Sequence, residues 1–262
     1  MRVGFLQFHP IFADIGQNLS RIEAKLSKVD ADLLVLPELF NTGYLFSGRK
    51  QLRQLAEEIP DGQTTRVLKS LSRKRKMAIV AGIAEKDRGK VYNSSIFVKP
   101  GGDIHLYRKL HLFDSEKRWF DAGNLKLEVI SFRGAKIGVM ICFDWIFPEV
   151  ARSLTLLGAE IICHPVNLVL HYCQRSMLTR SLENGIFTIT ANRIGTEQRN
   201  GERITFTGRS QITSPKGELM VSSPRNKESL EVADINVKEA RDKFFTPANH
   251  LIKDRRRTFY RL

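Results

Sequence analysis

The sequence predicts an α/β protein in which two β-sheets pack against each other and helices cover their outer faces. Three observations support this prediction. Both halves of the chain alternate apolar strands with amphipathic helices, the middle is rich in strands joined by glycine turns, and the 262 residues are 42% hydrophobic. Apolar strands interleaved with helices are typical of sheets that helices cover. A chain of this length and composition can bury one large core.

The first third of the chain contains two strand and helix units. Residues 2–8 (RVGFLQF) form the first expected strand, and residues 18–29 form a helix whose apolar residues recur at helical spacing. A continuous apolar strand follows at residues 32–39. The second unit is a helix over residues 64–76 and a strand over residues 77–85. These periods predict helices packed on a largely buried sheet.

The middle of the chain predicts a meander of mainly antiparallel strands. Turns are expected at Gly101-Gly102 and at Gly134, where glycine permits tight reversals. The four expected strands cover residues 91–100, 102–111, 126–134 and 135–142. This β-rich region separates the two βα halves.

The second half returns to alternating helices and strands. Pro148 suits a first helical position and Gly158 suits a helix stop. The last strand segments, residues 208–220 and 229–237, are predicted to close the chain as a hairpin-like pair. Helices are expected over residues 148–158 and 175–185, and strands over residues 159–167 and 186–195.

No Pro/Gly/Ser-rich linker, low-complexity tract or fixed repeat divides the sequence, so residues 1–245 are predicted to form a single domain. Residues 246–262 are predicted to be a C-terminal tail. Three cysteines without a CxxC spacing indicate a reducing compartment rather than a disulfide framework. The apolar N-terminus is too short for a secretory leader, and no stretch reaches the roughly 18 apolar residues that span a bilayer. We therefore expect a soluble, cytoplasmic protein without a membrane partner.

The formal net charge of +14 raises the question of an anionic partner, because 42 Lys and Arg stand against 28 Asp and Glu. The basic residues concentrate at residues 69–76 and 253–262. The first run falls on an amphipathic helix, where a charge cluster usually forms a solvated face. No zinc-finger, RRM-like or helix-turn-helix motif accompanies the charge. A non-catalytic nucleic-acid-binding protein is therefore kept as an alternative, and nucleic acid is not an expected partner.

Three polar residues lie at the ends of apolar segments: Glu38, Lys109 and Cys142. Taken singly, they fit a solvated turn carboxylate, a lysine that reaches water and an inert buried thiol. Glu116, seven residues after Lys109, could be a surface acid. Taken together, Glu38, Lys109 and Cys142 suit acyl transfer. A thiolate attacks, a desolvated carboxylate moves the proton, and an ammonium stabilises the oxyanion. Spacing alone leaves open whether these side chains meet.

Metal chemistry is not indicated by the sequence. His105 and His111 lie in the same stretch as Lys109, but neither has a partner at a metal-ligand spacing. A structural or solvated histidine is the expected role of each. We predict no metal and no organic cofactor.

Three segments resemble a known family. Residues 36–44 (LPELFNTGY), residues 107–113 (YRKLHLF) with Glu116 following, and residues 138–149 (GVMICFDWIFPE) look like the three catalytic segments of the nitrilase superfamily, the carbon–nitrogen hydrolases. Their order and approximate spacing agree with the family, from the first strand to about residue 245. The resemblance implies a four-layer α-β-β-α sandwich, a more definite form of the fold predicted above.

The resemblance also implies roles for the four polar residues. Glu38 would be the general base, Lys109 the oxyanion stabiliser and Cys142 the nucleophile, while Glu116 would be a second acid that orients the lysine or the substrate. The family further implies a homodimer or a higher homo-oligomer, with the tail of residues 246–262 packed against a partner subunit.

The residues after the nucleophile suggest the substrate class. Phe143-Asp144 resembles amidase and carbamoylase branches, whereas true nitrilases commonly carry Trp-Glu there. Asn167 in HPVNLVL resembles the small aliphatic amidases and ω-amidases. We therefore predict hydrolysis of a small aliphatic carboxamide to a carboxylic acid and ammonia through a cysteine thioester. A nitrilase acting on small aliphatic nitriles and an N-carbamoyl amidohydrolase remain alternatives.

Further residues are expected to contact the substrate. The backbone N–H of Phe143 would help to hold the oxyanion. Arg175 could bind a substrate carboxylate bidentately, or it could pair with a helix acid. Cys163 and Cys173 are expected to be bystanders. The other expected pocket residues, of which the aromatic ones could equally pack in the core, are Tyr44, Phe113, Trp145 and Asn167.

Overall fold

Two mixed β-sheets organise the chain in the computed structural model, which describes residues 1–199 and 201–260. In spatial order, the first sheet contains β14 (Ser229–Asp234), β1 (Arg2–Gln7), β2 (Leu33–Val35), β3 (Ala78–Asp87), β4 (Lys90–Val98) and β5 (Ile104–Arg108). The second contains β13 (Leu219–Ser222), β12 (Gln211–Thr213), β9 (Phe187–Ala191), β8 (Ile161–Pro165), β7 (Ala135–Val139) and β6 (Val129–Phe132). The three central strands are parallel in each sheet, β1-β2-β3 and β7-β8-β9.

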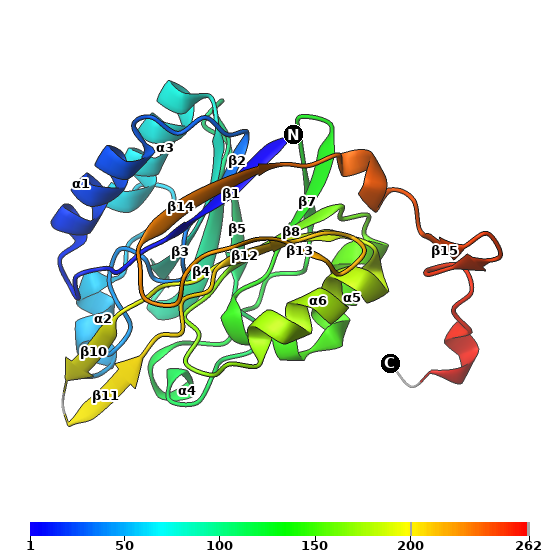
Figure 1. Cartoon of the computed structure of the whole chain (residues 1–262). Helices are drawn as coiled ribbons and strands as arrows, with labels where there is room; N and C mark the ends of the chain where they lie inside the picture. Colours follow the sequence, from blue (N-terminus) through cyan, green and yellow to red (C-terminus); the bar gives the residue numbers. More distant parts are fainter. Residues whose placement is uncertain (200, 261–262) are drawn as a thin grey trace.

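Helices cover the outer face of each sheet (Figure 1). The first sheet is covered by α1 (Ile15–Leu26) and α3 (Gln63–Arg75), and the second by α5 (Pro148–Leu156) and α6 (Cys173–Asn184). As expected, Pro148 begins α5, and the helix ends just before Gly158, whose φ is +99°. These layers confirm the predicted four-layer α-β-β-α sandwich.

The alternation along β2 shows how the layers are assembled. Leu33 and Val35 enter the core between the two sheets, whereas Leu34 and Leu36 enter the core under α1 and α3. Successive side chains of a strand point to opposite faces, so a strand buried on both faces must be apolar throughout. Burial on both faces therefore explains the continuous apolar run at residues 33–36.

The basic run at residues 69–76 lies mainly on α3. Leu68 and Leu71 are buried under the helix, and Arg73 and Lys74 are exposed. The charge cluster therefore forms the solvated face that the helical pattern predicted. Within residues 1–199 and 201–260, no helix combines the length and the apolarity required to cross a membrane.

Two predicted strand arrangements are wrong. The four middle strands pair antiparallel as β4-β5 and β6-β7, but the two pairs belong to different sheets and do not form one meander. Residues 208–220 and 229–237 do not pair with each other, because β12 turns back on β13, and β14 instead pairs with β1. Periodicity shows which face of a strand is apolar, but it does not show which sheet receives that face.

Near the ends of the central strands lie four short elements that the sequence analysis did not predict. They are α2 (Arg49–Leu55), α4 (Glu116–Trp119), and the hairpin of β10 (Thr196–Arg199) and β11 (Glu202–Thr205). Each is only four to seven residues long, so it carries too little periodicity to be recognised.

The C-terminal segment runs outward from the sandwich beyond α6 (Figure 1). It contains a 3₁₀ turn (Val237–Ala240), the hairpin of β15 (Phe244–Thr246) and β16 (Asn249–His250), and a second 3₁₀ turn (Arg257–Phe259). Lys243 Nζ donates to the carbonyl oxygens of Asn184 and Gly185 at 2.9 and 2.7 Å. A cation at the last carbonyls of a helix is favourable, so this contact attaches the segment to the end of α6.

Candidate active site

A buried lysine lies between two buried carboxylates at the ends of the first sheet's strands. Lys109 Nζ donates to Glu38 Oε1 at 2.8 Å and to Glu116 Oε1 and Oε2 at 2.9 and 2.7 Å. All three side chains are at most 3% exposed. The structure thus brings together Glu38 and Lys109, two of the three residues whose types suit acyl transfer, and adds Glu116, to which the family resemblance assigned a role.

Glu38 is positioned by a close approach of its backbone to β3. Phe40 N donates to the carbonyl of Gly82 at 3.2 Å, and a Cβ atom on Gly82 would lie 2.5 Å from Glu38 Cα. Only glycine permits that approach. Asn93 on β4 donates to Glu38 Oε1 at 2.7 Å. Glu38 Oε2 is buried and has no hydrogen-bond partner among the described residues, so this oxygen remains available for a ligand.

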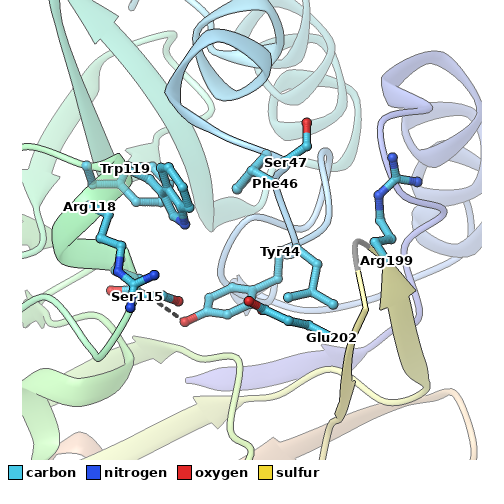
Figure 2. Close-up of a pocket in the computed structure, with 11 residues that line it drawn as sticks. Tyr44, Phe46, Ser47, Ser115, Arg118, Trp119, Arg199 and Glu202 are labelled. Carbon is cyan, nitrogen blue, oxygen red and sulfur yellow. Dashed lines mark hydrogen bonds between the residues drawn. The ribbon is translucent and has the colours of Figure 1, made fainter.

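Glu116 is held at the start of α4 by two donors besides Lys109. The Tyr44 hydroxyl donates to Oε1 at 3.0 Å, and the Phe113 backbone N–H donates to Oε2 at 2.9 Å. Figure 2 shows the tyrosine bond as a dashed line from the Tyr44 hydroxyl. A carboxylate with this many donors has one fixed orientation, and it fixes the lysine in turn.

Cys142 stands on a sharp turn between β7 and the 3₁₀ helix Cys142–Ile146. Its φ is +40°, a left-handed conformation that is costly for a residue with a side chain. His164 Nε2 lies 3.0 Å from the Cys142 carbonyl oxygen, and His164 Nδ1 lies 3.3 Å from Thr190 Oγ1. The buried imidazole therefore supports the backbone at the point where it is strained.

Asp144 also holds this turn. Its side chain is completely buried and accepts from the Ile141 backbone N–H at 2.9 Å and from the Tyr107 hydroxyl at 2.7 Å. Its other oxygen accepts from the His111 backbone N–H and lies 2.8 Å from His111 Nδ1. His111 thus has the structural role that the sequence predicted. Asp144 does not line the cavity at Cys142, so within Phe143-Asp144 only Phe143 can contact a substrate there.

The charged groups change one another's protonation. Burial opposes the charged ammonium, but the carboxylates of Glu116 and Glu38 outweigh it and hold the pKa of Lys109 above its usual value. Burial raises the pKa of Glu116 against the opposing attraction of Lys109. Burial and the nearby Glu38 raise the pKa of the Cys142 thiol well above its usual value, although Lys109 lowers it. The thiol therefore keeps its proton until a base removes it.

A cavity of about 200 Å³, hereafter the Cys142 cavity, opens at the thiol. Asn167 contributes its side-chain amide, whose nitrogen and oxygen are both buried without a hydrogen-bond partner in the described parts of the chain. The backbone N–H of Asn167 faces the thiol and lowers its pKa slightly. The other lining residues are apolar: Phe113, Phe143, Trp145, Ile146, Leu168, Val169, Leu170 and Tyr172. Four of the six predicted substrate-contact residues therefore line this cavity: Phe113, Phe143, Trp145 and Asn167.

The two other predicted substrate-contact residues lie elsewhere. Tyr44 lines a second cavity of about 240 Å³, which Glu116 also borders (Figure 2). Its polar rim includes Arg118, Arg199 and Glu202. Arg175, on α6, does not line the Cys142 cavity and instead borders a separate groove. The predicted contact between Arg175 and a substrate carboxylate finds no support in this geometry.

Sequence reasoning missed several partners of the site. Asn93, Tyr107 and His164 hold Glu38, Asp144 and the Cys142 carbonyl, respectively. His164 stands beside Asn167 in HPVNLVL, and its position inside an apolar strand is the one signal that could have revealed it. Within residues 1–199 and 201–260, no group of three His, Cys, Asp or Glu side chains is placed to hold a metal ion.

His164 gives a prediction on stability. Burial lowers its pKa to about 4 from the ordinary 6.5. Because the unfolded chain binds this proton at a higher pH than the folded protein, the free energy of unfolding should fall as the pH drops from 7 to 4. The loss from this one group should total about 3 kcal/mol.

The measurement is urea unfolding at pH 7, 5.5 and 4 for the wild type and His164→Gln, which does not titrate. The difference in unfolding free energy between the two should change by about 3 kcal/mol across this range. A constant difference would mean that the folded His164 binds its proton as readily as the unfolded one.

The chain resembles known proteins over nearly its whole length. The family model described as "Carbon-nitrogen hydrolase" matches residues 2–243. A nitrilase of Pyrococcus abyssi is 43% identical over 263 residues, covering 99% of both chains. An (R)-stereoselective amidase of a Pseudomonas species is 33% identical over 231 residues, covering 86% of this chain and 82% of that protein.

A solved structure shares the fold over nearly the whole chain. The carbon-nitrogen hydrolase of Helicobacter pylori G27 superposes with a TM-score of 0.86 at 26% sequence identity, covering 99% of this chain and 96% of that one. The resemblance stated from the three sequence segments is therefore confirmed. The chain is an enzyme that acts on carbon–nitrogen bonds, and it belongs to the carbon–nitrogen hydrolase family.

Proposed function

We propose that the protein hydrolyses a small aliphatic carboxamide to a carboxylic acid and ammonia, with Cys142 as the nucleophile. One observation carries the proposal: Lys109 is buried between the carboxylates of Glu38 and Glu116, and Glu38 Oε2 is buried without a hydrogen-bond partner among the described residues. A protonated thiol, a carboxylate with an unpartnered oxygen and a fixed ammonium are the three groups that acyl transfer requires.

In the first half-reaction, Glu38 takes the thiol proton while Cys142 Sγ bonds to the amide carbon. The carbonyl oxygen becomes an oxyanion that accepts hydrogen bonds from Lys109 Nζ and from the Phe143 backbone N–H. Phe143 stands in the first turn of a 3₁₀ helix, where N–H groups lack helical partners. The C–N bond then breaks, and Glu38 returns its proton to the leaving nitrogen, which departs as ammonia.

In the second half-reaction, Glu38 removes a proton from a water molecule while the oxygen of that water bonds to the thioester carbon. The oxyanion forms again at Lys109. The C–S bond breaks, the proton passes to Cys142 Sγ, and the carboxylic acid leaves. Glu116 keeps the ammonium in place throughout, because its oxygens are fixed by Tyr44 and the Phe113 N–H. These steps use only the chain's own residues and water.

The Cys142 cavity supports a small acyl group with an amide. Its volume of about 200 Å³ and its apolar walls suit a short aliphatic chain. Asn167 Oδ1 and Glu38 Oε2 are buried acceptors that can bind the substrate NH₂ group. Asn167 Nδ2 is a buried donor that can bind a polar substituent of the substrate. The amidase relative from Pseudomonas also favours this class, whereas the Pyrococcus nitrilase makes small aliphatic nitriles the competing one.

The test is a substrate panel of aliphatic amides, ω-amides, N-carbamoyl compounds and aliphatic nitriles, with Cys142→Ala as the blank. Ammonia release gives the rate and mass spectrometry identifies the acid. The proposal requires kcat/KM to be highest for an aliphatic amide. A nitrile ranking first would replace it with a nitrilase activity, and an N-carbamoyl compound ranking first would replace it with a carbamoyl amidohydrolase activity.

We also propose a homodimer or higher homo-oligomer in the cytoplasm, with residues 1–245 as the domain and residues 246–262 against the partner. Large apolar side chains are exposed around α5 and α6 and in the C-terminal segment. Such patches mark interaction surfaces in soluble proteins. They include Leu156, Leu157, Tyr172, Leu182, Phe244, Phe245, Phe259 and Tyr260.

The assembly prediction is a sedimentation mass that is a multiple of the 29.9 kDa chain. A chain ending at residue 245 should dissociate at lower concentration than the full chain, because it lacks apolar residues that we assign to the contact. A full-length monomer at micromolar concentration would contradict the proposal.

A further inference from the structure

Arg193 is a fully buried cation close to the candidate site. It follows β9, and its Nη1 lies 2.5 Å from Glu197 Oε1. Its guanidinium carbon lies 3.9 Å from the ring centroid of Phe206. Nε and Nη2 are buried and lack partners among the residues that the structure describes. Burying an ion pair with unmet donors costs desolvation free energy and is weak evidence for a stabilising role, so the pair calls for another explanation.

Glu197 connects this arginine to the loop that carries Tyr44. Its carboxylate accepts from the Tyr44 backbone N–H at 3.1 Å and from the Leu45 backbone N–H at 2.7 Å. It is 5% exposed. A carboxylate that binds two successive N–H groups fixes the local backbone, and the buried arginine fixes the carboxylate.

Two further contacts make this connection rigid. Gly43 has a φ of +83°, and a Cβ atom there would lie 2.9 Å from Glu197 Oε1 and 2.8 Å from Phe12. The loop therefore packs as closely on Glu197 as a backbone can. The rings of Tyr44 and Phe206 meet edge to face at 6.0 Å, so the arginine also reaches Tyr44 through Phe206.

The contacts then continue into the cluster. The Tyr44 hydroxyl donates to Glu116 Oε1, and both Glu116 oxygens accept from Lys109 Nζ. Figure 2 shows the Tyr44 side chain extending toward this bond. A displaced Tyr44 would leave Glu116 free to rotate, and Lys109 would lose the geometry in which it meets an oxyanion.

We infer that the Arg193–Glu197 pair is a positioning element. It fixes the position of the Lys109 ammonium through Tyr44 and Glu116. This role rests on the Cys142 chemistry proposed above. Neither residue of the pair contacts the Cys142 cavity, so their effect is expected on the rate of the chemical steps and not on substrate affinity.

The test is a double-mutant cycle of Glu197→Gln and Tyr44→Phe, assayed with the best amide of the substrate panel. Glu197→Gln should lower kcat about 10- to 100-fold and change KM by less than about threefold. In the Tyr44→Phe background, where the hydroxyl is already absent, Glu197→Gln should cost less than about threefold more. Additive effects on kcat would show that the pair does not act through the Tyr44 hydroxyl and would overturn the inference.

The matched control is Glu160→Gln. Glu160 also accepts from a backbone N–H, that of Lys136 at 2.8 Å, and pairs with an arginine, Arg241 at 2.6 Å, but it does not contact the cluster. It should leave kcat within about twofold of the wild type. An equal loss of kcat in Glu160→Gln and Glu197→Gln would reduce the pair to an ordinary structural contact.

Arg193→Lys keeps the cation and provides a second route if Glu197→Gln fails to fold. It should retain part of the wild-type kcat, and Arg193→Gln should retain less; the reverse order would overturn the inference.

Cys142→Ala in the same assay separates the two proposals. Activity in that variant would refute the thiol mechanism, whereas an inactive Cys142→Ala beside additive Glu197 and Tyr44 effects would refute only the positioning role.

Discussion

Cys142→Ala is expected to lower amide hydrolysis by more than about 10⁴-fold, because no other group can form the covalent intermediate. The two other cysteines do not replace it. Cys163 and Cys173 are buried, and their thiol pKa values are raised by burial without a carboxylate or lysine to move the proton. The measurement is ammonia release under single-turnover conditions, where even one thioester per enzyme is detected.

The control for this variant is Cys163→Ala, which removes a buried thiol from β8 and should keep nearly full activity. Hydroxylamine should trap a hydroxamate of the substrate from the wild type and none from Cys142→Ala. Turnover or hydroxamate in Cys142→Ala at a rate near that of the wild type would refute the thiol mechanism, since either product would then form without the Cys142 thioester.

Lys109→Met should damage both stability and catalysis. Removing the ammonium leaves the carboxylates of Glu38 and Glu116 buried and uncompensated, which should cost about 3–5 kcal/mol of unfolding free energy at neutral pH. Loss of the oxyanion donor should lower kcat by about 10²- to 10³-fold or more. Urea unfolding and the rate of amide hydrolysis measure the two effects separately.

The stability loss should depend on pH with a definite sign. Burial raises the pKa of Glu116, and without the opposing attraction of Lys109 this carboxylate takes up its proton at a higher pH than in the unfolded chain. Protonation then favours the folded state, so the deficit of Lys109→Met relative to the wild type should shrink as the pH falls from 7 to 5. A deficit that grows toward pH 5 would contradict the proposed charge balance.

The double variant Lys109→Met/Glu116→Gln separates charge from catalysis. It removes one of the two uncompensated carboxylates and should recover part of the stability that Lys109→Met loses. It still lacks the oxyanion donor, so its kcat should stay at the level of Lys109→Met. Recovery of kcat in the double variant would mean that the lysine serves only the fold.

Much of the fold was predictable because burial leaves a periodic record in the chain. Residues 33–36 are apolar at every position, and β2 is buried on both faces between the two cores. The pairing of β14 with β1 was not predictable. The register places Arg2 opposite Asp234, and backbone hydrogen bonds between residues more than 200 positions apart carry no local sequence signature.

The sequence by itself determined the family, the layered α/β fold and the four chemically suited residues, because apolar periodicity and short motifs are local properties. Only the tertiary structure decided which of these side chains meet. Lys109 and Glu38 are 71 positions apart, and Glu197 reaches Tyr44 across 153 positions. Such contacts depend on long-range packing, which places a group from one strand end against a group from another. For the same reason Asp144 proved to hold the turn at Cys142, and Arg175 proved to lie outside the cavity.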